Sequence, residues 1–230
     1  MEKQKSVKLI ECFNTFQGEG PDAGQAMTLL RFKYCNLSCP WCDTKIKMRI
    51  SIESSYTLQN IQKNLLESRT GLLITGGEPT IKTHFNETLL LINNLEYPVA
   101  NIESNGYNLL ELIKETNPAK NVHYIYSPKI FNNNDLNMAI KLTTKFLNKE
   151  YNNKVFIKVV YEDRPEINDF LSFLSTEINK RCNLWFTKVW LMPEGTTLVD
   201  IVRNSQKVFD ACEKFKFNFS SRQHIIFGFI

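Results

Sequence analysis

The stretch Met27-Thr-Leu-Leu-Arg-Phe-Lys-Tyr-Cys35-Asn-Leu-Ser-Cys39-Pro-Trp-Cys42-Asp-Thr44 joins a short apolar run to a loop with three cysteines. The run 27–32 predicts a β-strand. The three cysteines follow it directly, with the spacing C-x3-C-x2-C. In open α/β proteins, ligands lie at the carboxyl ends of the strands. We therefore expect other unusual segments of the chain to follow strands as well.

The rest of the chain alternates short apolar runs with longer amphipathic stretches, which indicates a parallel sheet crossed by helices. The predicted strands are 7–13, 27–32, 71–75, 99–103, 122–126, 155–160 and 184–191. The predicted helices are 58–68, 84–93, 109–115, 136–148, 166–179 and 198–214. Six or seven strands are too few for a closed eight-unit barrel. The sequence predicts one α/β domain over 1–230, with an incomplete (partial) β/α barrel of about six core strands.

Four polar segments follow predicted strands, as the sheet model requires. They are Thr75-Gly-Gly-Glu-Pro79, Glu103-Ser-Asn-Gly106, Ser127-Pro-Lys129 and Met192-Pro-Glu-Gly195. Taken alone, the first is also explained as a tight turn and the second as a turn capped by side chains. Their shared position after strands makes them candidates for ligand binding.

The composition is that of a soluble globular protein, with 230 residues, 43% hydrophobic residues and a net charge of +4. The apolar runs are shorter than the roughly 18 residues of a membrane span, and the first residues lack the apolar core of a signal peptide. We therefore expect a cytoplasmic protein without membrane or nucleic-acid partners. The densest basic group, Lys45, Lys47 and Arg49, is predicted to lie in a solvated loop or strand edge, with a phosphate-binding patch as the less favoured alternative.

Six cysteines in a reducing compartment indicate a metal or catalytic site where they cluster. A structural zinc site normally has four protein ligands, and the loop offers three. Three thiolates suit a [4Fe-4S] cluster that leaves one iron open to a ligand. Zinc with a remote fourth ligand and incidental buried thiols remain alternatives. Cys12, Cys182 and Cys212 stand alone and are expected to be small buried side chains.

The cysteine unit, with Trp41 before its last cysteine and Gly76-Gly-Glu-Pro79 after the next strand, resembles the radical S-adenosylmethionine (SAM) superfamily. Phe16-Gln-Gly-Glu-Gly20, Arg31, the ending Cys42-Asp-Thr44 and Thr75 resemble its 7-carboxy-7-deazaguanine synthase family. This resemblance covers nearly the whole chain. It implies a partial barrel of the radical SAM type and a lyase of queuosine biosynthesis, a tRNA modification pathway. The implied reaction converts 6-carboxy-5,6,7,8-tetrahydropterin to 7-carboxy-7-deazaguanine with loss of ammonia.

The resemblance also implies the ligands: a [4Fe-4S] cluster on Cys35, Cys39 and Cys42, SAM as the radical source, and Mg2+ bound with help from Thr44. No catalytic residue beyond the cluster and the cofactor radical is implied. The implied SAM-binding residues are Trp41, Asp43, Gly76, Gly77, Glu78, Ser104, Asn105, Ser127, Pro128, Lys129, Met192, Pro193, Glu194 and Gly195. The implied substrate-binding residues are Phe16, Gln17, Gly18, Glu19, Arg31, Thr75, His224 and Ile230. The implied partners are a reducing protein such as flavodoxin or ferredoxin and a second copy in a homodimer.

Two other functions are compatible with the cysteine spacing: an activase that installs a glycyl radical on a partner enzyme, and a small iron-sulfur electron carrier. A carrier usually supplies four cysteines per cluster. The activase is disfavoured by Gln17, Glu19, Arg31 and Thr44, because a protein substrate does not call for a pterin-sized polar pocket. The terminal segment 223–230 is either an edge strand or, by resemblance, a cover over the substrate. His84 and His123 show no partner pattern and are expected to be structural or exposed.

Overall fold

The computed structural model describes residues 5–148, 151, 154–181 and 188–229. The chain divides into two compact units, each of which is described by itself. The first unit holds the described residues up to 17, residues 24–124 and residue 229. The second holds residues 18–23 and the described residues of 125–228. The expectation of a single domain over 1–230 stays a prediction.

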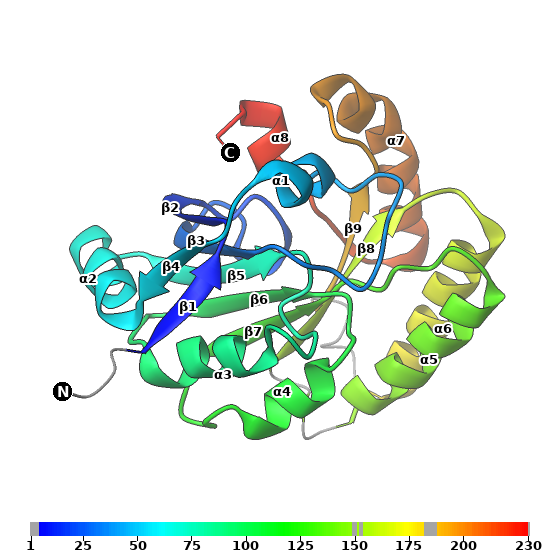
Figure 1. Cartoon of the computed structure of the whole chain (residues 1–230). Coiled ribbons are helices and arrows are strands. Elements are labelled where there is room, and N and C mark those ends of the chain that lie inside the picture. Colours follow the sequence, from blue (N-terminus) through cyan, green and yellow to red (C-terminus); the bar gives the residue numbers. More distant parts are fainter. Residues whose placement is uncertain (1–4, 149–150, 152–153, 182–187, 230) are drawn as a thin grey trace. The chain divides into compact units, whose positions relative to one another are not determined.

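The first unit is built on a mostly parallel sheet (Figure 1). Its strands are β1 (Ser6–Leu9), β2 (Glu11–Phe16), β3 (Ala26–Phe32), β4 (Ser54–Thr57), β5 (Gly71–Gly76) and β6 (Ala100–Ser104), and β7 (Val122–Tyr126) begins in it. Its helices are α1 (Lys45–Ile50), α2 (Leu58–Ser68), α3 (Phe85–Asn94) and α4 (Leu109–Glu115). β3, β5 and β6 run parallel in that order, and β2 pairs antiparallel with β3. The run Leu72 to Ile74 is buried on both faces, which explains why β5 is an inner strand.

The amino-terminal part of the first unit differs from the sequence prediction. The predicted strand 7–13 is two strands, because Ile10 leaves the ladder and donates its N–H to Arg31 O at 2.9 Å. β1 pairs with β4 in a separate two-stranded antiparallel sheet. The prediction of a loop or strand edge for Lys45, Lys47 and Arg49 is wrong, because these residues lie on α1. Six residues are too few to show a helical period in the sequence.

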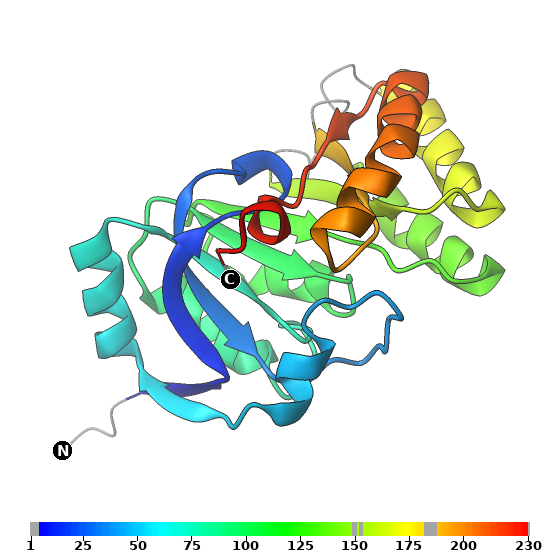
Figure 2. The ribbon, with the colours of Figure 1, turned by 90° about the horizontal axis from the view of Figure 1, so that it is seen from above.

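The described residues of the second unit include the end of β7, three further parallel strands and their helices. Its elements are the 3-10 turn η1 (Gly20–Asp22), α5 (Asn133–Phe146), β8 (Val155–Tyr161), α6 (Pro165–Arg181), β9 (Val189–Pro193), α7 (Leu198–Phe215), β10 (Asn218–Phe219) and α8 (Gln223–Phe227). β9 lies between β8 and β10. Helices α5, α6 and α7 lie side by side, as both ribbon views show (Figure 1, Figure 2).

The carboxyl-terminal elements also correct the sequence prediction. The predicted strand 184–191 is β9, which begins at Val189, and its residues 184–187 lie outside the described part. The edge-strand alternative for 223–230 is wrong, because Gln223–Phe227 is the helix α8. The short strand β10 was not predicted. Two residues carry too little alternation to be recognised as a strand.

The α/β class with parallel strands, predicted from the sequence, is confirmed. Because β3, β5 and β6 are parallel neighbours, the loops that follow them leave the same edge of the sheet. Those loops are the cysteine segment, the Gly-Gly-Glu-Pro segment and the Ser-Asn-Gly segment. In the second unit, Glu194 and Gly195 follow β9 in the same way. In the described part of the chain, no helix combines the length and the hydropathy that a membrane span requires.

Candidate active site

Two backbone hydrogen bonds connect the turn after β5 to the residues just before Cys35. Gly77 N–H donates to Phe32 O at 2.9 Å, and Glu78 N–H donates to Tyr34 O at 2.7 Å. A Cβ on Gly77 would lie 1.9 Å from Tyr34 O, so this approach requires glycine. Gly76 has φ +123°, a conformation that side chains rarely adopt. The first part of the cysteine loop is therefore fixed by the glycine turn.

The Glu78 carboxylate links the turn after β5 to the turn after β6. It accepts hydrogen bonds from Thr80 N at 3.0 Å, Thr80 Oγ1 at 2.7 Å, Ser104 Oγ at 2.8 Å and Asn105 N at 2.6 Å. The residue is 1% exposed, and its burial raises the pKa of Glu78 in spite of these donors. Its carboxylate therefore holds two predicted SAM-binding segments together from inside the protein.

His84 and Asn105 extend this network to the cysteine loop. The His84 ring is buried, lies 3.1 Å through Nδ1 from Glu78 O, and stacks on Phe32 with ring centroids 4.5 Å apart. Burial lowers the pKa of His84, which favours the neutral ring. Asn105 Nδ2 donates to Asn36 Oδ1 at 2.9 Å. His84, expected to be structural or exposed, is buried beneath the glycine turn.

The three clustered cysteines lie on the loop between β3 and α1. Cys39 is buried, whereas Cys35 and Cys42 are partly exposed. Leu37 N–H donates to Cys35 Sγ at 3.4 Å, and Thr44 Oγ1 lies 3.4 Å from Cys42 Sγ. Three sulfur donors on one short loop suit a cluster that leaves one iron for another ligand.

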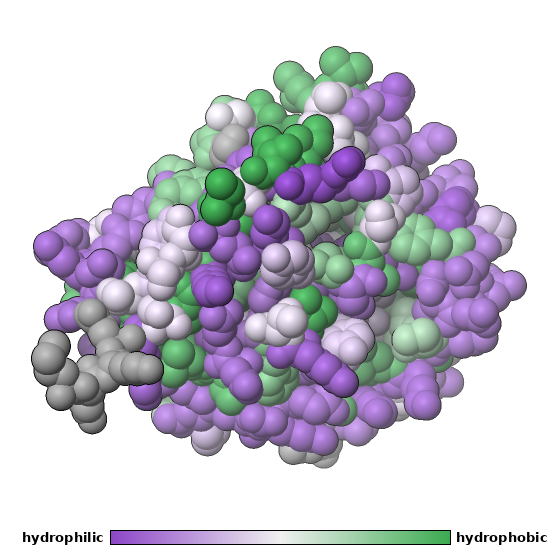
Figure 3. Space-filling model, viewed as in Figure 1, coloured by the Kyte–Doolittle hydropathy of each residue, from purple (hydrophilic) through white to green (hydrophobic). Residues whose placement is uncertain are grey.

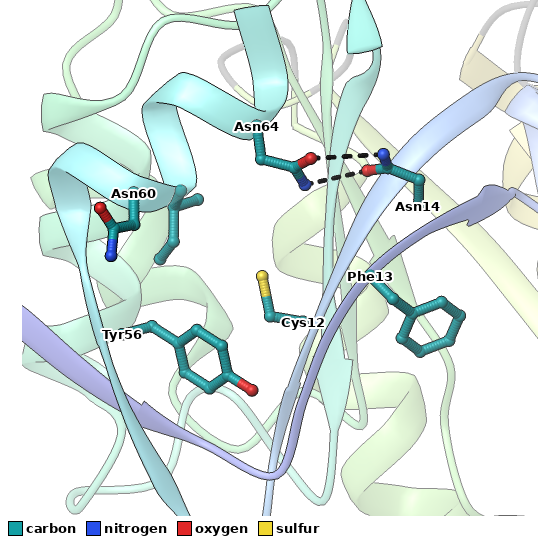
Figure 4. Close-up of a pocket in the computed structure, with 7 residues that line it drawn as sticks. Cys12, Phe13, Asn14, Tyr56, Asn60 and Asn64 are labelled. Carbon is teal, nitrogen blue, oxygen red and sulfur yellow. Dashed lines mark hydrogen bonds between the residues drawn. The ribbon is translucent and has the colours of Figure 1, made fainter. Parts of the chain in front are cut away.

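The isolated cysteines differ from one another. Cys212 is buried, and burial raises its pKa to about 11, which keeps the thiol neutral. Cys12 is only partly buried and lines a cavity of about 400 Å³ together with Phe13, Asn14, Tyr56, Asn60, Ile61 and Asn64 (Figure 4). None of the predicted site residues lines that cavity. Cys182 lies outside the described residues.

Arg31 is held at the end of β3 by a carboxylate that the sequence analysis missed. The Arg31 Nε–H donates to Glu11 Oε2, and Lys47 Nζ donates to Glu11 Oε1 at 2.9 Å. Burial would raise the pKa of Glu11, but the hydrogen bonds from Lys47 and Arg31 outweigh it and lower the pKa. The register of β2 on β3 places Glu11 opposite Arg31. The sequence analysis predicted one strand over 7–13, where the structure has β1 and β2, so it could not place Glu11 opposite Arg31.

Phe16 is the last residue of β2, Gln17 follows it, and both lie in the first unit. The Gln17 amide is 4% exposed and donates through Nε2 to Asn101 Oδ1 at 2.9 Å and to Glu103 Oε1 at 3.3 Å. Phe16 is half exposed and meets the ring of Phe229 edge to face at 6.0 Å. The residue before the chain end is thus packed on the predicted substrate loop, whereas Ile230 lies outside the described residues.

Glu19 lies in a buried group of cations in the second unit. Lys158 Nζ donates to its Oε2 at 2.6 Å, Arg222 Nε donates to its Oε1 at 3.0 Å, and His224 Nε2 lies 3.5 Å away. Burial would raise the pKa of Glu19, but the charges of Lys158, Arg222 and His224 outweigh it and hold the pKa far below its usual range. Lys158 had a recognisable signal, because it interrupts an otherwise apolar strand. Arg222 had none.

Glycines bring the terminal helix α8 against this group. Gln223 N–H donates to Gly18 O at 2.9 Å, and a Cβ on Gly18 would lie 2.2 Å from His224 Nδ1. Gly195 has φ +148°, and its carbonyl accepts a hydrogen bond from Arg222 Nη1. The segment that carries His224 is therefore tied to the Gly18–Glu19 loop and to the turn after β9.

The two units divide the predicted site residues between them. The first unit holds Phe16, Gln17, Arg31, Cys35, Cys39, Trp41, Cys42, Asp43, Thr44, Thr75, Gly76, Gly77, Glu78, Ser104 and Asn105. The second holds Gly18, Glu19, Ser127, Pro128, Lys129, Met192, Pro193, Glu194, Gly195 and His224. Lys129 Nζ donates to Ser127 Oγ at 2.5 Å, so the Ser-Pro-Lys turn is closed on itself.

Comparisons with known proteins identify the family. Residues 29–162 match the model of the radical SAM superfamily. The chain is 30% identical over 208 residues to the 7-carboxy-7-deazaguanine synthase of Clostridium acetobutylicum, with 87% of this chain and 90% of the relative covered. The chain belongs to the 7-carboxy-7-deazaguanine synthase family of the radical SAM superfamily. A [4Fe-4S] cluster and SAM are therefore its cofactors.

Two further comparisons agree with this assignment. The 7-carboxy-7-deazaguanine synthase of Hyperthermus butylicus is 22% identical over 226 residues, which cover 96% of this chain and 92% of that relative. The crystal structure of QueE from Escherichia coli matches with a TM-score of 0.58 and 16% identity over 93% of this chain and 92% of that one. The predicted partial barrel of the radical SAM type is confirmed by this likeness of fold.

Gly77→Ala tests the glycine turn. The new methyl group would meet Tyr34 O, so we expect the backbone pairing before Cys35 to break and iron-sulfur absorbance after anaerobic reconstitution to fall severalfold. Gly228→Asn is the control, because its φ of +64° suits Asn and the space around it is open. Full cluster content in Gly77→Ala, with an unchanged circular dichroism spectrum, would contradict this role of the turn.

Glu19→Gln tests the buried ion group through the pH dependence of unfolding. Leaving Lys158 and Arg222 without the carboxylate typically costs about 3–5 kcal/mol at neutral pH. The pKa of Glu19 is lower in the folded protein than in the unfolded chain, where it is about 4.3. The charged carboxylate therefore stabilises the fold at pH values above about 4.3, and this stabilisation is lost as the pH falls further. The difference in the free energy of unfolding between wild type and Glu19→Gln should therefore become smaller in acid. Urea unfolding measures it, and exposed Glu67→Gln should change stability by under about 0.5 kcal/mol.

Proposed function

We propose that the chain is a 7-carboxy-7-deazaguanine synthase that converts 6-carboxy-5,6,7,8-tetrahydropterin to 7-carboxy-7-deazaguanine with loss of ammonia. The observation that carries the proposal is the 30% identity to the Clostridium acetobutylicum enzyme over nine tenths of that enzyme's length. Two buried polar residues support it: Gln17, which follows β2, and Arg31, which lies near the end of β3. A glycyl-radical activase and an electron carrier gain no comparable support from these features.

We assign the cluster to Cys35, Cys39 and Cys42, since their loop offers three sulfur donors. Together with bound SAM, a cluster held by these cysteines would supply the radical chemistry that removes a hydrogen atom from the substrate. The chain's own contribution is placement. The Gly76–Gly77 turn brings backbone close to the cysteine loop, and the Glu78 carboxylate fixes Ser104 and Asn105 beside it. The assignments of Trp41, Asp43 and the second-unit segments as SAM contacts stay part of this proposal.

Arg31 is assigned to the substrate carboxylate. A guanidinium has five N–H donors in a fixed fork, so its pairing with Glu11 through Nε is compatible with a second carboxylate partner. The buried Gln17 amide, together with Phe16, Gly18, Glu19, Thr75, His224 and Ile230, is assigned to the rest of the substrate. Lys158 and Arg222 keep Glu19 charged, so it would act as a hydrogen-bond acceptor.

Thr44 is assigned to a Mg2+ ion beside the substrate. It stands at the N-cap of α1, yet its side chain makes no capping hydrogen bond, so the hydroxyl is not required for the helix. One hydroxyl, substrate oxygens and water are the hard ligands that magnesium prefers.

The proposed cellular context is the cytoplasm, with a reducing partner and a second copy of the chain. The cytoplasm keeps cysteine thiols reduced, and the three clustered cysteines must be reduced to bind the cluster. Because the reaction starts with an electron from outside, a reducing partner of the flavodoxin or ferredoxin type is required. A homodimer is proposed from family resemblance.

The proposed reaction is tested by anaerobic incubation of the reconstituted protein with SAM, a reductant and the carboxytetrahydropterin. We expect 7-carboxy-7-deazaguanine, detected by mass spectrometry, together with ammonia. Cys35→Ala, Cys39→Ala and Cys42→Ala should each abolish cluster absorbance and product, whereas Cys212→Ala should retain both. SAM cleavage without the deazaguanine product would reject the pterin substrate and keep the superfamily chemistry.

Arg31→Ala separates substrate binding from radical generation. Loss of a buried charge-assisted pair typically costs about 2–5 kcal/mol, which corresponds to an increase in substrate KM of tens to thousands of fold. Cluster content and SAM binding should stay at the wild-type level. Glu11→Ala is the matched variant, because it keeps the Arg31 guanidinium and removes the carboxylate that Arg31 shares with Lys47, and we expect a smaller rise in KM. A near-normal KM for Arg31→Ala would reject the substrate assignment of this residue.

Thr44→Ala tests the magnesium assignment. We expect turnover to fall and to lose its dependence on added Mg2+, while cluster content is unchanged. Wild-type activity that is equal with and without Mg2+ would remove the reason for the assignment.

A further inference from the structure

Helix α1 and the residues just after it expose apolar side chains that take no part in the core of the protein. Ile46 is 72% exposed, Ile50 is 74% exposed and Ile52, just after the helix, is 86% exposed. None of the residues of α1 is buried. Three isoleucines in seven residues at such exposure cost solubility, and grouped apolar side chains of this kind mark interaction sites. In the space-filling view, strongly hydrophobic side chains lie next to strongly hydrophilic ones over α1 (Figure 3).

The same helix concentrates the positive charge of the chain. Residues 33–52 contain four basic residues, Lys33, Lys45, Lys47 and Arg49, against Asp43 as the one acidic residue of that sequence. This segment therefore has a net charge of +3, within a chain whose total is +4. Lys45 and Arg49 are four residues apart, a spacing at which like charges repel on a helix. Helix stability alone does not favour that arrangement.

The anchor of α1 fixes which of its faces points outward. Lys47 donates to Glu11 Oε1 and ties the helix to β2. Lys45 and Arg49 are two residues away on either side, about 200° around the helix axis, and both are exposed. Ile46 and Ile50 follow each of them directly. The outward face is thus an apolar pair beside a basic pair.

The location of this face suggests its use. α1 begins three residues after Cys42, and Tyr34 and Leu37 on the cysteine loop are also exposed, at 50% and 38%. A radical SAM cluster takes one electron from outside for each SAM cleavage. Electron transfer slows steeply with distance, so the donor must dock at the surface nearest the cysteines. Such redox encounters use small interfaces, and opposite charges steer them.

We propose that the outward face of α1, formed by Lys45, Ile46, Arg49, Ile50 and Ile52, is the docking surface for a small acidic one-electron carrier protein. The carrier is oxidised by one electron and the cluster is reduced by one. The basic residues orient the acidic carrier, and the isoleucines supply the desolvated centre of the contact. This inference rests on the proposed function only in that the cluster requires an external electron.

The test is anaerobic calorimetric titration of the reconstituted holoprotein with an oxidised flavodoxin, at low and at high salt. We expect Lys45→Glu/Arg49→Glu to lower the affinity at least about tenfold and to abolish its salt dependence. The charge-matched control is Lys63→Glu/Lys114→Glu, at exposed positions on α2 and α4. Ile50→Ser should also weaken binding, whereas Leu66→Ser, at 60% exposure on α2, should not.

A second measurement separates docking from folding and from the pterin reaction. Cluster reduction is followed by electron paramagnetic resonance without pterin. The double variant should be reduced normally by dithionite, which needs no docking, and slowly by reduced flavodoxin. Wild type that binds flavodoxin without salt sensitivity, or a double variant that binds and is reduced as wild type, overturns the proposal. So does sedimentation showing that the double substitution dissociates a dimer while flavodoxin binding is unchanged.

Discussion

The buried carboxylate of Glu78 is the constraint on which the first unit's cysteine edge depends. A carboxylate at 1% exposure is tolerated only when donors surround it, and here two side-chain hydroxyls and two backbone N–H groups do so. These donors come from the turns after β5 and β6, so satisfying the charge also fixes the two turns against each other. The Glu78 N–H extends the constraint to Tyr34 and therefore to the cysteine loop.

The sequence predicted the parts of this arrangement that are local. Apolar runs such as 71–75 are strands because they are buried on both faces, and the motifs after them lie at the strand ends for the same reason. The sequence could not show that Glu78 reaches Ser104, since that contact joins residues 26 positions apart. The prediction for α1 failed because six residues with no buried side chain leave no periodic pattern to recognise.

The charged partners of Glu19 and Glu11 were even harder to predict from the sequence. Glu19 was identified by its motif, but its partners Lys158 and Arg222 are 139 and 203 residues away, and only the fold brings them together. The sequence-based role of Glu19 in substrate recognition must now accommodate those two cations. Glu11 was hidden for a different reason: two strands were merged into one, and the register that places Glu11 opposite Arg31 was lost.

In the first unit, the Glu11 carboxylate joins the residue assigned to the substrate to the helix proposed as the electron-carrier docking surface. Glu11 holds Arg31 through one oxygen and Lys47 of α1 through the other, and both bonds favour its charged form. The cation that would meet the substrate is therefore positioned by the group that anchors the helix beside the cysteines. Because Lys47 points toward Glu11, Lys45 and Arg49, which lie about 200° away around the helix axis, point toward solvent. The geometry that stabilises α1 on the sheet thus also produces its basic and apolar outer face.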